Sequence, residues 1–99
     1  MAPPPPGFEW DPEKARLNAA KHGISFELAV TIFDGWVFSF DDDRFDYGEV
    51  RVTAYGLCRG VEIMVVYTER SDRRRVISAR RATRYERNQY WEAYRDAHG

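Results

Sequence analysis

Apolar residues in the N-terminal third of the chain recur at helical spacing. Asp11 is a good N-cap, Pro12 suits the first helical position, and Gly23 suits the stop after the last turn. Ser25 can cap a second helix, whose apolar positions continue to Asp34. The pattern therefore predicts two short helices, the first with a small apolar face made of Ala15, Leu17, Ala19 and Ala20.

From residue 36 onward the apolar positions alternate with a period of two. Residues 36–40 and 49–57 show the alternation of half-buried strands. Residues 61–69 are almost continuously apolar, which predicts a central strand, and residues 73–79 predict a further one. The links between the last three segments are short, so we expect an antiparallel meander.

Helical spacing returns in the last part of the chain. Thr83 and Glu86 form a T-x-x-E capping box that opens a helix. Tyr90, Trp91 and Tyr94 lie on one face of that helix and can pack on the sheet. The complete order predicts an α+β domain with two N-terminal helices, a four-stranded antiparallel sheet and a C-terminal helix.

The composition is that of one globular domain. The chain has 99 residues, of which 43% are hydrophobic and 15% aromatic. The start, MAPPPPGF, has neither the basic residues nor the apolar core of a signal peptide. No apolar run approaches the length of a membrane helix. We expect residues 1–7 to form a flexible proline-rich tail and residues 8–99 to form a single domain.

Neither cysteine nor acidic residues point to a disulfide or a metal. Cys58 is the single cysteine and is interpreted as an ordinary small residue in a reducing cytoplasm. The acidic run at residues 41–43 lacks the spacing of a calcium loop, so a solvated acidic loop is favoured. We expect a cytoplasmic protein that needs no cofactor and no metal.

Charge is distributed unevenly along the chain. The net charge of −1 argues against a simple nucleic-acid binder. Residues 1–50, however, contain ten acidic and four basic residues, whereas residues 51–99 contain eleven arginines, no lysine and six acidic residues. This asymmetry indicates a basic working surface. The exclusive use of arginine favours forked contacts with carboxylate or phosphate.

The densest positive charge falls where the last strand meets the last helix, at Arg80, Arg81, Arg84 and Arg87. A helix N-terminus carries a partial positive charge, so each exposed cation there costs about 0.3–1 kcal/mol. One interpretation is a solvated face whose arginines pair with nearby carboxylates, of which Glu69, Glu86 and Glu92 are candidates.

A bound phosphate is the alternative explanation for this charge. Strand alternation places Arg80 on the same face as Val76 and Arg81 on the opposite face, so at least one guanidinium should emerge near the interior. An unpaired charge there costs several kcal/mol. Arginine forks and the free N–H groups of a first helical turn can together bind a phosphate. We expect a phosphate clamp here, with Arg87 solvated.

Three segments resemble the BrnT toxins of bacterial type II toxin–antitoxin pairs. They are FEWDPEKARLNAAKHGISFELAVTIFDG, RFDYGEVRVTAYG and VVYTERSDRRRVISARRATRYER, and the resemblance runs from about Phe8 to Tyr90. It implies a RelE-like fold and a ribonuclease that cleaves RNA without metal. It also implies a BrnA-like antitoxin that holds the toxin inactive, with DNA bound only through the antitoxin complex.

The resemblance also implies site residues by motif position. ISARR supplies Arg80 and Arg81 as catalytic candidates, YTER supplies Glu69, and KHG supplies His22. The substrate-binding candidates are Lys21, Arg70, Arg84 and Tyr67. Each of three candidates has a structural alternative: a C-terminal helix cation for His22, a solvated side chain for Lys21, and a core position, which is favoured, for Tyr67.

Cleavage of this kind needs deprotonation of a 2′-OH, stabilisation of the phosphorane charge and protonation of the leaving 5′-oxygen. Arg80 and Arg81 suit the second task, Glu69 could be the base, and His22 could be acid or base. An alternative function is a non-catalytic module that binds the antitoxin and regulates their shared promoter. A domesticated, inactive toxin is a third possibility.

Overall fold

The computed structural model describes residues 3–42 and 48–99 of the chain. The elements follow in the order β1 (Phe8–Glu9), α1 (Pro12–His22), α2 (Phe26–Ala29), the 3₁₀ helix η1 (Val30–Asp34), β2 (Phe38–Asp42), β3 (Arg51–Cys58), β4 (Val61–Arg70), β5 (Arg73–Arg81) and α3 (Arg84–His98). The predicted α+β class is confirmed. Met1 and Ala2 of the expected tail, and Asp43 of the acidic run, lie outside the described residues.

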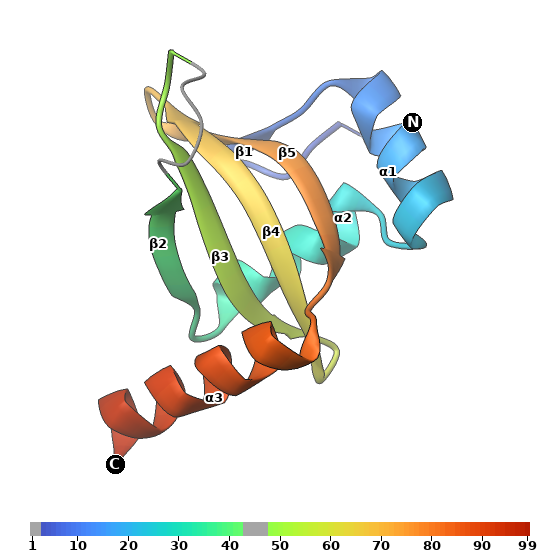
Figure 1. Cartoon of the computed structure of the whole chain (residues 1–99). Helices are drawn as coiled ribbons and strands as arrows, with labels where there is room; N and C mark the ends of the chain where they lie inside the picture. The colour runs from blue at the N-terminus through green and yellow to red at the C-terminus, as the bar shows by residue number, and fades with distance from the viewer. Residues whose placement is uncertain (1–2, 43–47) are drawn as a thin grey trace.

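The sheet has five strands in the order β1-β5-β4-β3-β2, so the prediction of a four-stranded antiparallel sheet is wrong in one respect (Figure 1). β2 to β5 form the predicted antiparallel meander, and β1 adds to β5 in parallel. β1 has only two residues, which is too short to show the alternation of apolar and polar residues from which a strand is predicted. It is held by Arg74, whose N–H donates to the Gly7 carbonyl at 2.9 Å, and by an ion pair between Arg75 and Glu9 at 2.8 Å.

The helix ends follow the capping residues of the sequence. Asp11 accepts a hydrogen bond from the Glu13 N–H at 2.8 Å, and Gly23 closes α1 at φ 72°. Ser25 accepts from the Leu28 N–H at 3.1 Å. The second predicted helix changes to 3₁₀ geometry after Ala29. The capping box that opens α3 is present as predicted.

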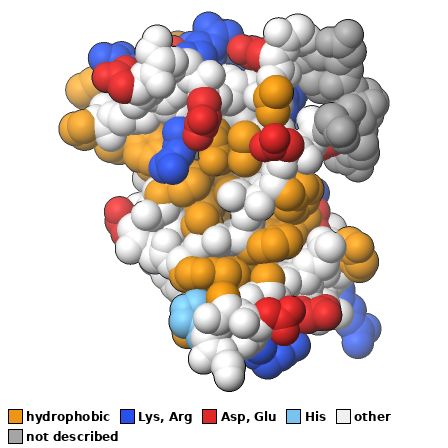
Figure 2. Space-filling view, turned by 90° about the vertical axis from the view of Figure 1, so that its left-hand side faces the viewer, with side chains coloured by type: hydrophobic (Ala, Val, Ile, Leu, Met, Phe, Trp, Pro, Cys, Tyr) orange, Lys and Arg blue, Asp and Glu red, His pale blue; other side chains and the backbone are white. Residues whose placement is uncertain are grey.

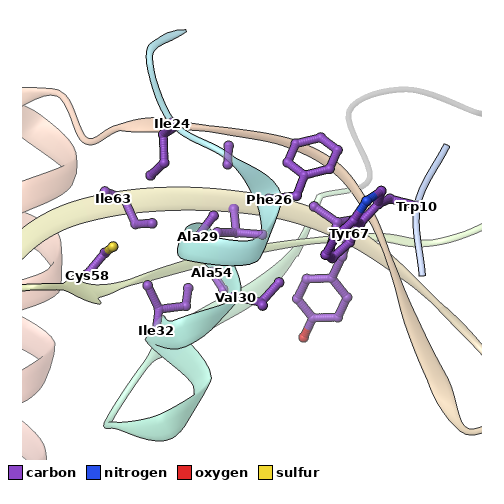
Figure 3. Close-up of a cluster of buried hydrophobic side chains, with 13 residues drawn as sticks. Trp10, Ile24, Phe26, Ala29, Val30, Ile32, Ala54, Cys58, Ile63 and Tyr67 are labelled. Carbon is purple, nitrogen blue, oxygen red and sulfur yellow. The ribbon is translucent and has the colours of Figure 1, made fainter. Parts of the chain in front are cut away.

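Two apolar clusters lie on opposite faces of the sheet. The larger one lies under α2 and η1, where Phe26, Ala29 and Val65 are fully buried (Figure 3). The smaller one lies under α3, which crosses the lower end of the other face (Figure 1). There Tyr90 packs with Tyr55 and Met64.

Two of the three residues of the predicted aromatic face of α3 pack on the sheet as expected. Tyr90 and Trp91 belong to the cluster under α3, and Tyr94 makes edge contacts with Trp36. The Trp91 indole N–H also donates to Glu62 at 2.7 Å. Figure 2 shows the side of the molecule that bears β2, where hydrophobic side chains gather across the middle of the surface. Phe40 of β2 contributes exposed apolar surface, at 38%.

A β-bulge in the β4–β5 ladder changes the predicted faces of β5. The register shifts between Val66 and Tyr67, so Val76 and Ala79 both enter the larger cluster. The prediction that Val76 shares a face with Arg80 is therefore wrong, because the bulge inserts a residue and inverts the alternation before it.

Candidate functional site

Arg80 and Arg81 point to opposite faces of the sheet. Arg80 is paired in register with Met64, which belongs to the cluster under α3. Arg81 is paired with Ile63, which belongs to the cluster under α2 and η1. Because neighbouring strand residues alternate, the two guanidinium groups do not form one clamp.

Arg80 lies in a groove of about 580 Å³ between the open face of the sheet and the first turns of α3. Strands β2, β3 and β4 supply its floor, and Thr83, Tyr85 and Gln89 line the side of the helix. Tyr85 is 70% exposed at this edge. The groove therefore combines Arg80, three carboxylates from Asp41, Asp42 and Glu86, aromatic rings and the start of a long helix.

The guanidinium of Arg80 is fixed by Glu86. Its Nη1 and Nη2 donate to the two carboxylate oxygens of Glu86 at 2.8 and 2.9 Å, and Nη1 also donates to the Arg81 carbonyl at 3.1 Å. The hydrogen bonds from Arg80 hold the pKa of Glu86 below its ordinary value, although burial opposes this shift. Glu86 raises the pKa of Arg80 in turn. The arginine cluster is interpreted from the sequence either as pairing with carboxylates or as binding a phosphate. Arg80 pairs with a carboxylate, that of Glu86.

One edge of the Arg80 guanidinium is left over. An arginine has five N–H donors, and the contacts to Glu86 and Arg81 use three of them. Within residues 3–42 and 48–99, Nε–H and the second Nη2 hydrogen have no acceptor. Within the same residues, the backbone N–H groups of Arg84 and Tyr85 in the first turn of α3 also have no acceptor, as is usual at a helix start. These donors suit an anion.

His22 and Arg81 meet in a second hollow on the opposite face, although 58 residues separate them in the sequence. The hollow has a volume of about 210 Å³ and is also lined by Arg59 from the β3–β4 turn. His22 and Lys21 are exposed in the last turn of α1. The structure thus brings one predicted catalytic pair together, but away from Arg80.

Glu69 and Arg70 lie at the far end of β4. Glu69 is six positions beyond Ile63, or about 20 Å at the rise of a strand. Arg70 contacts Glu49 at 3.4 Å. The structure therefore does not place Glu69 beside either of the two hollows that contain Arg80 and Arg81.

The remaining predicted residues fall in different surroundings. Tyr67 is 5% exposed in the larger cluster, edge-on to Phe33, and burial raises the pKa of its hydroxyl. Arg84 is exposed at the start of α3. Arg87 is only partly exposed, because its Nη1 donates to the Ala82 carbonyl at 3.1 Å, so the prediction that it is solvated is wrong.

Sequence reasoning missed Asn18, which positions the strand that bears the arginines. Its amide donates to the Ala79 carbonyl at 2.9 Å and accepts from the Ala79 N–H at 3.1 Å, as a neighbouring strand would. Asn18 is 8% exposed, whereas Leu17, which was assigned to the apolar face, is 52% exposed. Asn18 is three positions after Ala15, so helical spacing places both residues on the same face of α1. This spacing is the signal in the sequence that indicates a buried Asn18.

The fold and the groove define a small α+β domain with an arginine at the junction of sheet and helix. A family model described as the ribonuclease toxin BrnT of type II toxin–antitoxin systems matches residues 10–86, and the chain belongs to this family. No individual curated protein matches significantly. Within the described part of the chain, no helix has the length and apolar composition that crossing a membrane requires.

Proposed function

We propose that this toxin cleaves RNA endonucleolytically in the Arg80 groove, without a metal ion, and that a BrnA-like antitoxin neutralises it. Family membership supports ribonuclease activity and an antitoxin partner in general terms. The observation that carries the location is the unused edge of the Arg80 guanidinium, which lines the groove of about 580 Å³ beside the start of α3.

In the proposed reaction the ribose 2′-oxygen attacks the adjacent phosphorus and loses its proton. The bond from phosphorus to the 5′-oxygen breaks, and that oxygen gains a proton, so the products are a 2′,3′-cyclic phosphate and a 5′-hydroxyl. Negative charge accumulates on the non-bridging oxygens in between. Arg80 and the free N–H groups of Arg84 and Tyr85 stabilise that charge.

Glu86 has a positioning role in this scheme. Both of its oxygens bind Arg80, and one also accepts from the Thr83 N–H at 2.8 Å. The guanidinium is therefore held in one orientation before the substrate arrives, which lowers the reorganisation needed during the reaction. The exposed rings of Tyr85 and Phe40 offer surfaces on which unpaired bases can stack.

The test is cleavage of a single-stranded RNA by purified toxin in the presence of EDTA. We expect cleavage to persist and to leave 2′,3′-cyclic phosphate ends. Arg80→Lys keeps a positive charge opposite Glu86 but loses the fork, so its rate should fall about 10²–10³-fold. Arg95→Lys is the matched control, because Arg95 is exposed in the last turn of α3, and should cleave normally.

Three outcomes would contradict this proposal. Cleavage that stops in EDTA and returns with Mg²⁺ would remove the metal-independent mechanism. Full activity of Arg80→Lys, together with loss of activity in His22→Gln, would move the reaction to the hollow on the opposite face. Absence of cleavage and of growth arrest in the unmodified toxin would favour the alternative, a non-catalytic antitoxin-binding and promoter-regulating module.

A further inference from the structure

The hollow that contains His22 and Arg81, here called the basic hollow, has an apolar floor. Ile24, Cys58 and Ile63 form its base, and all three are buried. Figure 3 shows these three side chains close together at one end of the larger core cluster. Leu28 and Val61 also line the hollow, and Val61 is 37% exposed. The core is thus open to the surface at this point.

The rim of the basic hollow is cationic. His22 comes from the last turn of α1, Arg59 from the β3–β4 turn and Arg81 from the end of β5, and all three are exposed. Of the described residues that line the hollow, none is acidic. A ring of basic side chains around an aliphatic floor is complementary to an apolar side chain that is flanked by carboxylates.

We propose that the basic hollow is a docking site for the antitoxin and receives an apolar side chain from an acidic segment of that protein. Membership of a toxin–antitoxin family indicates that the partner is an antitoxin. The positive charge of the rim indicates that the docked segment is acidic. RNA fits the hollow less well. Unpaired bases stack on aromatic rings or arginine planes, and here the two arginines lie only at the rim, the floor is aliphatic, and His22 is the single ring among the described lining residues.

The location has a consequence for neutralisation. Arg81 borders the basic hollow and Arg80 borders the groove, and the two lie on opposite faces of the sheet. A segment docked in the basic hollow therefore anchors the antitoxin without occupying the groove. This inference rests on the family membership of the chain and is independent of the chemistry proposed for Arg80.

The test uses the full toxin and its cognate antitoxin. Addition of the antitoxin to ¹⁵N-labelled toxin should shift the amide signals of Gly23, Ile24, Gly60 and Val61. Arg59→Glu reverses one rim charge, and Val61→Asp places a carboxylate at the hollow. We expect each to weaken antitoxin binding about tenfold or more in calorimetry.

Arg95→Glu is the matched control for charge reversal, because Arg95 is an exposed arginine on another element. It should bind the antitoxin with unchanged affinity. All three variants should cleave RNA as the unmodified toxin does, so loss of docking is distinguishable from loss of catalysis. Arg59 lies in an exposed turn, so Arg59→Glu should have the same melting temperature as the unmodified toxin. If Val61→Asp does not fold stably, the affinity of Arg59→Glu for the antitoxin is the result that decides.

Two results would overturn the inference. One is native affinity of Arg59→Glu for the antitoxin with no shift of the four amide signals. The other comes from titration with a 2′-O-methylated single-stranded oligouridylate, which cannot be cleaved. If this RNA shifts the same four signals and the antitoxin does not, the basic hollow is a nucleic-acid site.

Discussion

At the scale of single residues, Glu86 connects stability with the groove. Its oxygens accept from both terminal nitrogens of Arg80 and from the Thr83 N–H, so one carboxylate fixes the guanidinium and caps α3. Only 13% of the Glu86 side chain is exposed, against 34% for Arg80. Removing Arg80 therefore leaves a largely buried carboxylate with fewer partners. We expect Arg80→Ala to cost about 1–3 kcal/mol, less than a fully buried pair because Arg80 is partly solvated.

This pair makes part of the stability dependent on pH. The pKa of Glu86 is lowered in the folded state, so its contribution is complete above the ordinary carboxyl pKa of 4.5. As the pH falls below that value toward the folded pKa, the contribution is lost. The difference in unfolding free energy between the unmodified toxin and Glu86→Gln should be constant near neutral pH and shrink in acid. Denaturant unfolding from pH 7 to pH 3 measures it, and a difference that grows in acid would contradict the pairing.

At the scale of elements, α1 substitutes for a missing strand along β5. β1 pairs only with Arg74 and Arg75, and farther along the strand Asn18 supplies hydrogen bonds to both backbone groups of Ala79. Asn18→Ala removes these partners and leaves buried backbone groups unsatisfied. We expect a loss of about 2–4 kcal/mol, since each unsatisfied group costs about 1–3 kcal/mol.

Leu17→Ala is the control for this substitution. Leu17 is the neighbouring residue on α1 and is 52% exposed, so its truncation should change the melting temperature little. Thermal unfolding of both variants gives the comparison. Equal stability of Asn18→Ala and Leu17→Ala would mean that the contacts of Asn18 with β5 contribute nothing.

At the scale of the whole molecule, we expect the positive charge of the C-terminal half of the chain to attract the antitoxin. The eleven arginines of residues 51–99 exceed their acidic residues by five. Electrostatic attraction to an acidic antitoxin should accelerate association and be screened by salt. We expect the antitoxin to co-purify with the toxin, and the association rate to fall about tenfold or more between low and high salt. Stopped-flow measurements test this, and a rate that salt does not change would contradict the charge-based part.

Several features of the fold and site were predictable from local sequence. The caps Asp11, Ser25 and Thr83 and the stop at Gly23 each act within one helical turn, and all are present. The meander followed from alternation and short links. The buried side of α1 was not predicted, because an alanine-rich helix shows little contrast between its faces. Asn18 is buried there by its contacts with Ala79, far along the chain.

By itself, the sequence determined the helix ends, the antiparallel strands and the concentration of arginine after β4, because these depend on neighbouring residues. Only the tertiary structure decided what each arginine does. Arg80 contacts Glu86, and Arg81 lines the same hollow as His22 on the opposite face. The bulge between Val66 and Tyr67 and the parallel pairing of β1 with β5 are also seen only in the tertiary structure. The physical reason is that these arrangements depend on packing and pairing between segments distant in the chain, which no local pattern records.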